Sequence, residues 1–429
     1  MKKFLPAGVI LFLTVLLTVS TTGCKKTIKP AEGKIELAFW GGWTGSNKRQ
    51  MVKIVEDFNA KNKNIHVTLT TYEWEPLFNK LLTAYRGGTP PDVIAMRQTD
   101  ITQYASLGIL EPMDIPLGKI SIHSNDFAAH IWEGFKYNGE LYAMPFDIHM
   151  LAMFYNREMF EEAGLDPDDP PQDWESLTET VKKLTIRDEA GKVTQYGIGI
   201  PAVHQNAYRY WFSLLYQNGG RFLTPDGRRA AFNSPEGVEA CEFLHDLIYA
   251  YKAAPEQEAD AVKDFKERKI AIIFDLPWLV SVMSKGQEFD FAIAPFPKIF
   301  EKNAVWANSH GLSIPKRVKS DPARRDAVLK LLRFISDSSL EWAEGGQIPV
   351  RRSILESQEF KSLSLLFPFV YSIQHAVYLP KLKKASLIFA PDANTPMMSA
   401  MQEILLNKKT PQEALDSAAK QVDEILGKR

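Results

Sequence analysis

The chain has 429 residues, of which 45% are hydrophobic and 24% charged, a composition typical of folded proteins and a length sufficient for two domains with separate cores. Lys and Arg total 51 against 52 Asp and Glu, and the net charge of -1 disfavours a dedicated nucleic-acid-binding function. Two cysteines exclude a disulfide framework and a cysteine-rich metal site.

Residues 1–23 have the layout of a secretory signal peptide. Two lysines precede an apolar stretch over 4–19, which is shorter than the about 20 residues that a spanning helix needs. Gly23-Cys24 resembles the bacterial lipobox, in which the cysteine is lipidated, although Thr21 stands where leucine is usual. We therefore predict cleavage before Cys24, a lipid anchor on it and a tether over 24–32. An ordinary signal peptide with an incidental cysteine is the alternative.

The next part of the chain predicts strands that alternate with helices. Apolar residues alternate over 35–40 and 65–69, and 93–96 is a short apolar run, so all three predict strands. An apolar stripe predicts a helix over 47–61, and a second helix over 76–86 begins with proline and is followed by two glycines. The order β-α-β-α-β indicates a parallel sheet with helices on its faces.

A second α/β set follows residue 145. Strands are predicted over 197–200 and 270–274, and helices over 207–217 and 236–251. The last part of the chain is mainly helical, with helices predicted over 322–344, 359–367 and 411–427. Two α/β lobes joined by more than one crossing suggest a cleft between them, because ligands of open α/β sheets bind beyond the carboxyl ends of the strands.

Seven local patterns, in one order along the chain, together resemble the extracellular solute-binding proteins of ABC importers, the maltose-binding-like family 1. They are WGGW at 40–43, GGTPPDV at 87–93, GILEP at 108–112, GELYAMP at 139–145 with FYNR at 154–157 and FEEAGL at 160–165, WESL at 174–177, the segment 265–278 that ends in DLPW, and QIPVR at 347–351. The resemblance covers nearly all of the chain after the tether.

This resemblance implies an α/β, two-lobed periplasmic-binding-protein fold, type II-like, with a hinge between the lobes. It places lobe one at 33–145 plus 299–350 and lobe two at 146–298 plus 351–429. It also implies that a solute bridges the lobes, that the closed state docks on ABC permease subunits in the membrane, and that no bond is made or broken. We expect a carbohydrate ligand, in particular an oligosaccharide, no cofactor, no nucleic acid and a monomer.

Candidate binding residues are aromatic and polar side chains near strand ends. Sugar hydroxyls bond to polar groups, and sugar C–H faces pack on aromatic rings. Tyr208 and Trp211 are three apart in a predicted helix, so we expect one to face the core and the other the cleft. Members of the solute-binding family that this chain resembles often carry a ligand-stacking Trp at the position of Trp278. The predicted ligand-binding residues are Trp40, Trp43, Trp74, Arg97, Gln98, Asp147, His149, His204, Tyr208, Trp211, Asp275, Trp278, Trp306, His310 and Arg351. For each of them, core packing or a surface role is the alternative.

Several other motifs are discounted. The run GIGIPA at 197–202 matches a dinucleotide-binding pattern, but Pro201 and the loop after it do not provide a helix start there. The sequence contains no P-loop lysine motif, no H-E-x-x-H and no G-x-S-x-G. The eight histidines are scattered without metal-ligand spacing, so we predict no metal site.

Other functions remain open from the sequence. A secreted glycoside hydrolase would need two carboxylates about 5–10 Å apart, and the chain has many acidic residues. A same-fold polyamine binder would use cleft carboxylates such as Asp100, Asp147 and Asp275. A glycerol phosphate binder would need basic residues clustered at helix N-termini. A binding subunit of a sensor would share both the fold and the binding step.

Overall fold

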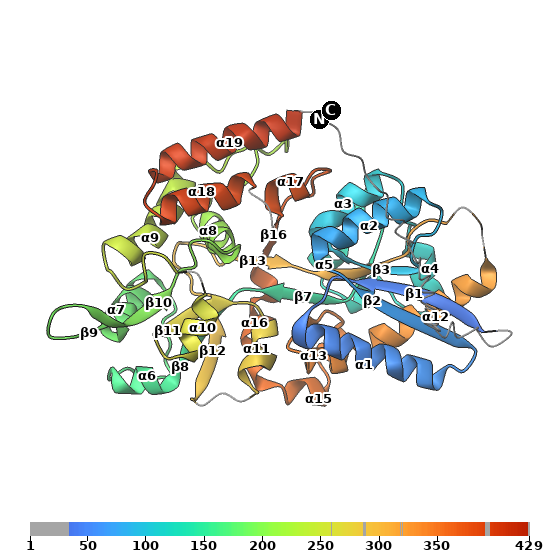
Figure 1. The fold of residues 1–429 in the computed structure, drawn as a ribbon, viewed down its shortest axis with the longest axis horizontal. Helices are drawn as coiled ribbons and strands as arrows, with labels where there is room; N and C mark the ends of the chain where they lie inside the picture. The colour runs from blue at the N-terminus through green and yellow to red at the C-terminus, as the bar shows by residue number, and fades with distance from the viewer. Residues whose placement is uncertain are drawn as a thin grey trace, which may run out of the picture.

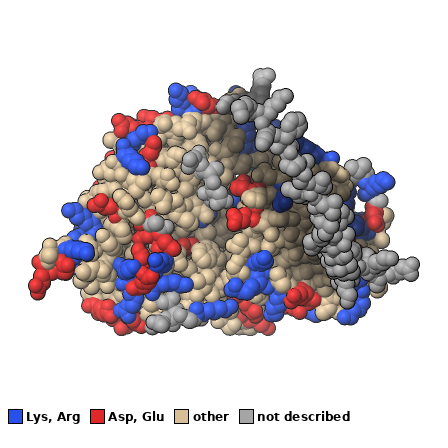
Figure 2. Space-filling model, viewed as in Figure 1, with Lys and Arg blue, Asp and Glu red and all other residues tan. Residues whose placement is uncertain are grey.

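The computed structural model describes residues 34–258, 260–285, 289–317, 319, 321–390 and 395–427. The predicted signal peptide and the lipidation site Cys24 therefore lie outside the described residues. Figure 1 shows two α/β lobes side by side, with strands running between them. Within the described ranges, no helix is both long and apolar enough to cross a bilayer. Acidic and basic side chains are interspersed over the face shown in Figure 2.

The sheet of lobe one has the strand order β2-β1-β3-β14-β6. Strands β1 (Ile35–Gly41), β2 (Ile65–Thr71) and β3 (Val93–Arg97) are parallel, as the sequence predicts. Strands β14 (His310–Ser313) and β6 (Met144–Pro145) join this sheet antiparallel. The chain therefore returns to the sheet of lobe one at residue 310, after the sheet of lobe two, which strand periodicity alone does not predict.

Amphipathic helices cover this sheet. Helix α1 (Gly45–Lys61) buries Met51, Ile54, Val55 and Phe58, the spacing of one helical face. Helix α2 (Trp74–Arg86) begins two residues before the predicted start, because proline is tolerated in the first turn of a helix. The other elements on this side are α3 (Gln98–Ser106), α4 (Asp114–Lys119), η1 (Ser124–Asp126), α5 (Ala129–Gly134), β4 (Lys136–Tyr137), β5 (Glu140–Leu141) and α12 (Pro322–Asp337).

The sheet of lobe two has the strand order β12-β8-β11-β10-β9. Strands β10 (Val193–Gly199) and β11 (Ile270–Asp275) are parallel, whereas β8 (Ala152–Asn156) and β12 (Phe291–Pro295) run antiparallel to their neighbours. The short β9 (Ile186–Arg187) forms the edge. Each of the two sheets thus combines parallel strands with antiparallel additions.

Helices pack on both sides of the second sheet. They include α6 (Arg157–Glu162), α7 (Trp174–Leu184), α8 (Asn206–Gln217), α9 (Pro235–Tyr249), α10 (Ala261–Lys266) and α11 (Trp278–Met283). Helices α18 (Pro396–Leu405) and α19 (Pro411–Gly427) contact α9, and Figure 1 shows them above lobe two. Cys241 on α9 is a buried free thiol, as its place in an apolar helical stripe predicts.

A four-stranded sheet connects the lobes, in the order β15-β7-β13-β16. Strand β7 (Asp147–Met150) leads from β6 of lobe one to β8 of lobe two, and β13 (Val305–Asn308) leads back to β14. Strands β15 (Ile348–Pro349) and β16 (Ala376–Tyr378) flank them. The hinge that the family resemblance implies stays a prediction. The exact division of residues between the lobes stays a prediction.

Two helix predictions near the end of the chain are wrong in extent. The predicted helix over 322–344 is divided at Ser338 into α12 and α13 (Ser339–Ala343), where serine hydroxyls compete for backbone groups, as in the bond from Ser339 Oγ to Ser336 O. The predicted helix over 359–367 is interrupted: one helix ends at Lys361, a 3-10 turn follows over 364–366, and a new helix begins at Phe367 with Pro368 in its first turn, where proline is favoured. The short elements in this region are α14 (Arg352–Leu355), α15 (Gln358–Lys361), η2 (Ser364–Leu366), α16 (Phe367–Ser372), η3 (Ile373–His375) and α17 (Ser386–Phe389).

Candidate functional site

A cavity of about 450 Å³ lies between the lobes, beside the crossing strands. Lobe one contributes the loop after β1, the start of α2 and the end of β3, and lobe two contributes the start of α8 and the end of β11. These are carboxyl ends of strands, where ligands of α/β sheets bind. The predicted residues that line the cavity are Trp43, Trp74, Arg97, His149, His204, Tyr208, Asp275, Trp278, Trp306 and His310.

Interlocked rings form the wall from lobe one. The rings of Trp74 and His310 stack with centroids 4.9 Å apart and an interplanar angle of 3°. Trp43 meets His310 edge-on at 6.0 Å and Trp342 at 5.2 Å. Gly42 makes this packing possible, because a Cβ there would lie 2.2 Å from the Trp74 ring. The aromatic surface on this side of the cavity is therefore fixed in place before any ligand enters.

Arg97, at the end of β3, is matched by two carboxylates. Its Nε donates to Asp100 at 2.6 Å and its Nη2 to Glu75 at 2.8 Å, while its guanidinium lies 5.6 Å from the Trp74 ring. Burial lowers the pKa of Arg97, but the charges and hydrogen bonds of the two carboxylates outweigh it, so the pKa lies above the ordinary value. Arg97 therefore stays charged and fixed in position.

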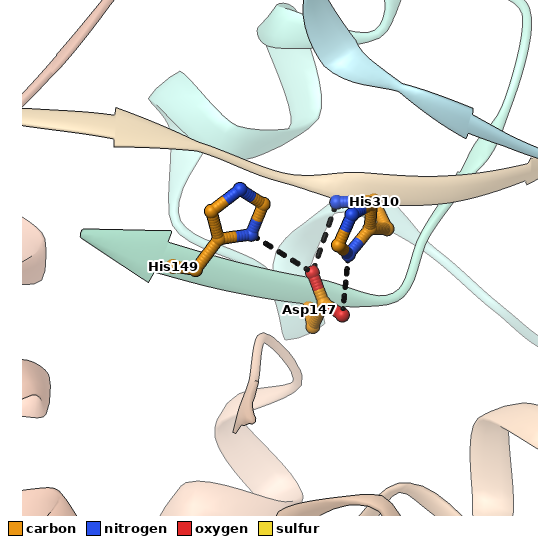
Figure 3. A group of neighbouring side chains, drawn as sticks. All are labelled: Asp147, His149 and His310. Carbon is orange, nitrogen blue, oxygen red and sulfur yellow. Dashed lines mark hydrogen bonds and ion pairs between the residues drawn. The ribbon is translucent and has the colours of Figure 1, made fainter. Parts of the chain in front are cut away.

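Asp147, on β7, lies behind the cavity wall and orients His310 (Figure 3). The buried carboxylate accepts three hydrogen bonds of 2.9 Å, from the backbone N–H and Nδ1 of His310 and from Nε1 of Trp342. His149 Nδ1 lies 3.7 Å from Asp147 Oδ1. Burial opposes ionisation, yet the charge and hydrogen bonds of His310, together with the nearby His149, hold the pKa of Asp147 well below its usual range. Asp147 is therefore a positioning residue.

The same three side chains have a spacing that could hold a metal ion. Donor atoms of Asp147, His149 and His310 lie within 4.8 Å of one another. However, both carboxylate oxygens already accept hydrogen bonds. Burial lowers the pKa of His149 to about 4, so this imidazole is neutral at neutral pH. We interpret Asp147 and His310 as a hydrogen-bonded pair that supports the cavity wall, with His149 close by.

Arg209, on α8, belongs to the wall from lobe two and differs from Arg97. Its Nη1 donates to Asn206 Oδ1 at 2.8 Å and its Nη2 to Gln205 Oε1 at 2.7 Å, both neutral amides. Its guanidinium stacks on Trp306 at 4.3 Å, and within the described part of the chain it forms no ion pair. The wall of lobe two thus carries a buried cation held by neutral partners.

Asp275, at the end of β11, is the buried carboxylate of the same wall. Its Oδ1 accepts a hydrogen bond from the N–H of Leu276 at 2.7 Å. Burial raises the pKa of Asp275 to about 6, although this hydrogen bond and the charge of Arg209 oppose the shift. Trp278 follows at the start of α11 and is half-buried at the cavity. A carboxylate and an indole therefore lie side by side, as a sugar site needs.

Five predicted residues lie outside the cavity lining, and we do not retain them as ligand contacts. Trp40 packs edge-on against Tyr72 at 5.5 Å on the sheet of lobe one. Gln98 is buried and donates to Gly134 O at 3.3 Å. Asp147 supports His310 from behind, as described above.

The other two corrections concern Trp211 and Arg351. Trp211 is fully buried on α8, where its Nε1 donates to Gly237 O at 2.9 Å, so Tyr208 alone of this pair lines the cavity. Arg351 donates to Asp126 at 2.6 Å and to Asp337 at 2.9 Å, and these ion pairs hold it within lobe one.

The cavity also contains residues that sequence reasoning missed. Arg209 stands in the predicted loop-to-helix segment, and its position one residue after Tyr208 is a signal that could have identified it. Asn308 and Thr99 meet in a hydrogen bond of 3.2 Å at the crossing strands. A late segment contributes Leu379, Ala385, Ser386, Phe389 and Ala390. The sequence of this segment contains no motif that indicates a binding role. The segment reaches the cavity only through the topology of the folded chain.

Known proteins share this architecture. A family model for bacterial extracellular solute-binding proteins matches residues 53–368. A maltotriose-binding protein of Pyrococcus abyssi is 24% identical over 386 residues, which cover 88% of this chain and 79% of that protein. The sn-glycerol-3-phosphate-binding periplasmic protein of Escherichia coli is 20% identical over 419 residues, which cover 92% and 93%.

Solved structures give the same result for the fold. An ABC transporter solute-binding protein of Thermotoga lettingae, bound with alpha-D-tagatose, superposes with a TM-score of 0.77 and 26% identity, and the match covers 92% of this chain and 100% of that chain. The GacH receptor of Streptomyces glaucescens superposes with a TM-score of 0.78 and 20% identity, covering 92% and 99%. These likenesses confirm the predicted two-lobed α/β fold.

Proposed function

Because the chain belongs to the bacterial extracellular solute-binding proteins, we propose that it captures a carbohydrate in the interlobe cavity and delivers it to the transmembrane subunits of an ABC importer. One observation carries this proposal: the two lobes place half-buried Trp74 and Trp278 on one cavity that also contains buried polar side chains. Aromatic faces take the C–H surface of a sugar, and the polar groups take its hydroxyls.

Closure of the lobes is the transport step in this proposal. A ligand that contacts both walls binds the closed state more tightly than the open state and shifts the population toward closure. The crossing strands β7 and β13 provide the connection about which the lobes would move. The relatives named above as binding maltotriose and alpha-D-tagatose support a sugar as the solute.

The protein acts by binding alone, without catalysis. Family membership supports this, since these proteins are described as solute-binding proteins. The buried Asp100 is held by Arg97 and is therefore not a free acid or base. Incubation with the sugar that binds best should release no new reducing ends, whereas their appearance would establish the hydrolase alternative.

Lipidation of Cys24 anchors the protein to the outer side of the cell membrane. The signal-like start of the sequence and the lipobox resemblance support this anchor. Cys24→Ser should move the protein from the membrane fraction of cells to the medium or periplasm, while Cys241→Ser, at the buried thiol, should stay with the membrane. A membrane-bound Cys24→Ser protein would contradict the anchor.

The protein works as a monomer, which analytical ultracentrifugation checks.

A binding screen tests the proposed solute class. Purified protein is mixed with oligosaccharides, polyamines and glycerol phosphates, and Trp fluorescence and melting temperature are recorded. A micromolar ligand corresponds to about -8 kcal/mol and raises the melting temperature by mass action. We expect a shift with one class of sugar. A shift with glycerol phosphates or polyamines alone would overturn the proposal of a carbohydrate solute but keep the binding function. No shift with any compound would contradict both the solute class and the binding function.

A further inference from the structure

The segment 379–390, which we call the strap, forms part of the cavity although it comes after both main sheets are complete. It follows β16 and contains α17. In Figure 1, α17 lies between α3 of lobe one and α18 of lobe two. Contacts with α18 and a hydrogen bond to α3 confirm that it touches both sides. The strap therefore lies between elements of the two lobes and lines the cavity.

One face of the strap lines the cavity, and the other is exposed. Ala385, Ser386 and Phe389 line the cavity, and their spacing of three and four residues places them on one helical face. Phe389 is 6% exposed, whereas Leu387, on the opposite face, is 56% exposed. The lining face combines small side chains with one large ring, so it sets the free volume at this end.

Hydrogen bonds hold the strap to lobe one. Ser386 Oγ donates to Gln103 Oε1 on α3 at 3.2 Å. Lys381 Nζ donates to the backbone oxygens of Lys136, at 3.1 Å, and Glu133. These bonds fix the near edge of the strap against the wall that carries Arg97.

Apolar packing and one further hydrogen bond hold the strap to the C-terminal part of lobe two. The rings of Phe389 and Phe222 lie 4.9 Å apart. Lys384 Nζ donates to Ile425 O on α19 at 3.1 Å. Because it is packed on both sides, the strap is a wall of the cavity and not a loose loop beside it.

We propose that the strap is a specificity-determining wall that closes one end of the cavity and limits the length of the saccharide held there. The inference rests on the proposed function. The lining face of the strap carries one large ring, Phe389, and the small side chains of Ala385, Ser386 and Ala390. In this proposal Phe389 blocks the end of the cavity and the small side chains leave room for one end of the ligand. A longer chain would have to displace Phe389 from its packing against Phe222.

A ladder of linear saccharides of increasing length tests this role. Affinities are measured by calorimetry for the purified protein and for three variants. Ser386→Trp fills the end of the cavity and should weaken the longest ligand that the natural protein binds by about tenfold or more, while shorter ligands keep their affinity. Phe389→Ala opens the same end and should improve the next longer ligand by about tenfold. Leu387→Trp adds the same bulk on the exposed face and should change nothing.

The outcomes separate this inference from the proposed function. If the natural protein binds saccharides but the length profiles of Ser386→Trp and Phe389→Ala equal its own, the strap does not determine specificity. If it binds no saccharide of any length, the proposed function fails and the inference with it. Melting temperatures show whether each variant is folded, and because the two variants change volume in opposite directions, either one that folds decides the question.

Discussion

The two walls of the cavity are built differently. On lobe one, Arg97 has carboxylate partners and Trp74 is stacked on His310, which Asp147 holds from behind. On lobe two, Arg209 has neutral partners and Asp275 carries a carboxyl that burial makes hard to ionise. The arginine of lobe one thus bonds two carboxylates directly, whereas the carboxylate of lobe two acts on Arg209 only through its charge. This difference suggests that lobe one receives the solute and that lobe two gains most from contact with it.

The largest expected effect comes from the support of the first wall. Asp147→Ala should lower the free energy of unfolding by about 3–5 kcal/mol, because it leaves the donors of His310 and Trp342 buried without an acceptor. Asp169→Ala, at an exposed position of lobe two, is the control and should leave stability nearly unchanged. Chemical denaturation measures both. A loss below about 1 kcal/mol for Asp147→Ala would show that the wall does not depend on this carboxylate.

The two arginines allow a direct comparison of the walls. Arg97→Met leaves the buried Asp100 without its partner and should cost about 3 kcal/mol of unfolding free energy. Arg209→Met removes hydrogen bonds to two neutral amides and should cost about 1–2 kcal/mol. Parallel denaturation curves measure the difference. Equal losses of unfolding free energy in the two variants would contradict the difference between an arginine with carboxylate partners and one with neutral partners.

Periodicity predicted the β-α-β-α-β order of lobe one because its segments, such as 35–40 and 47–61, are strongly periodic and have partners near in sequence. Sequence reasoning was less accurate where partners are distant. Asp147 was selected for its chemistry, but its partner Trp342 is 195 residues away, and only the folded chain shows that it faces the wall. Trp211 and Tyr208 share a helix, and packing alone decides which one is buried.

Ligand affinity gives a further comparison of the two walls, with smaller expected effects. Trp278→Ala should weaken sugar binding by about 1–3 kcal/mol and leave the fold intact, because this half-buried ring offers its surface to the ligand. Trp74→Ala should weaken binding to a similar extent and also lower the melting temperature, since it removes the stack on His310. Tyr371→Ala, at an exposed aromatic outside this cavity, is the control. Unchanged affinity in Trp278→Ala would remove Trp278 from the site.

The last expected effect is a pH dependence from Asp275. Burial raises its pKa from 3.8 to about 6, so the native state binds this proton more tightly than the unfolded state. Native stability should therefore fall as pH rises through this interval and then level off. Asp275→Asn lacks the ionisation and should gain about 3 kcal/mol relative to the natural protein between the two ends of the interval, since one pKa unit corresponds to about 1.4 kcal/mol. Denaturation at several pH values checks this, and a constant difference between the two proteins would contradict it.

A crystal structure of the protein with the sugar selected by the binding screen tests the central claim most directly. We predict that the sugar lies in the interlobe cavity in contact with Trp74 on one wall and with Trp278 on the other. A sugar that contacts one lobe alone, or that lies outside this cavity, would contradict the account of capture by two unequal walls.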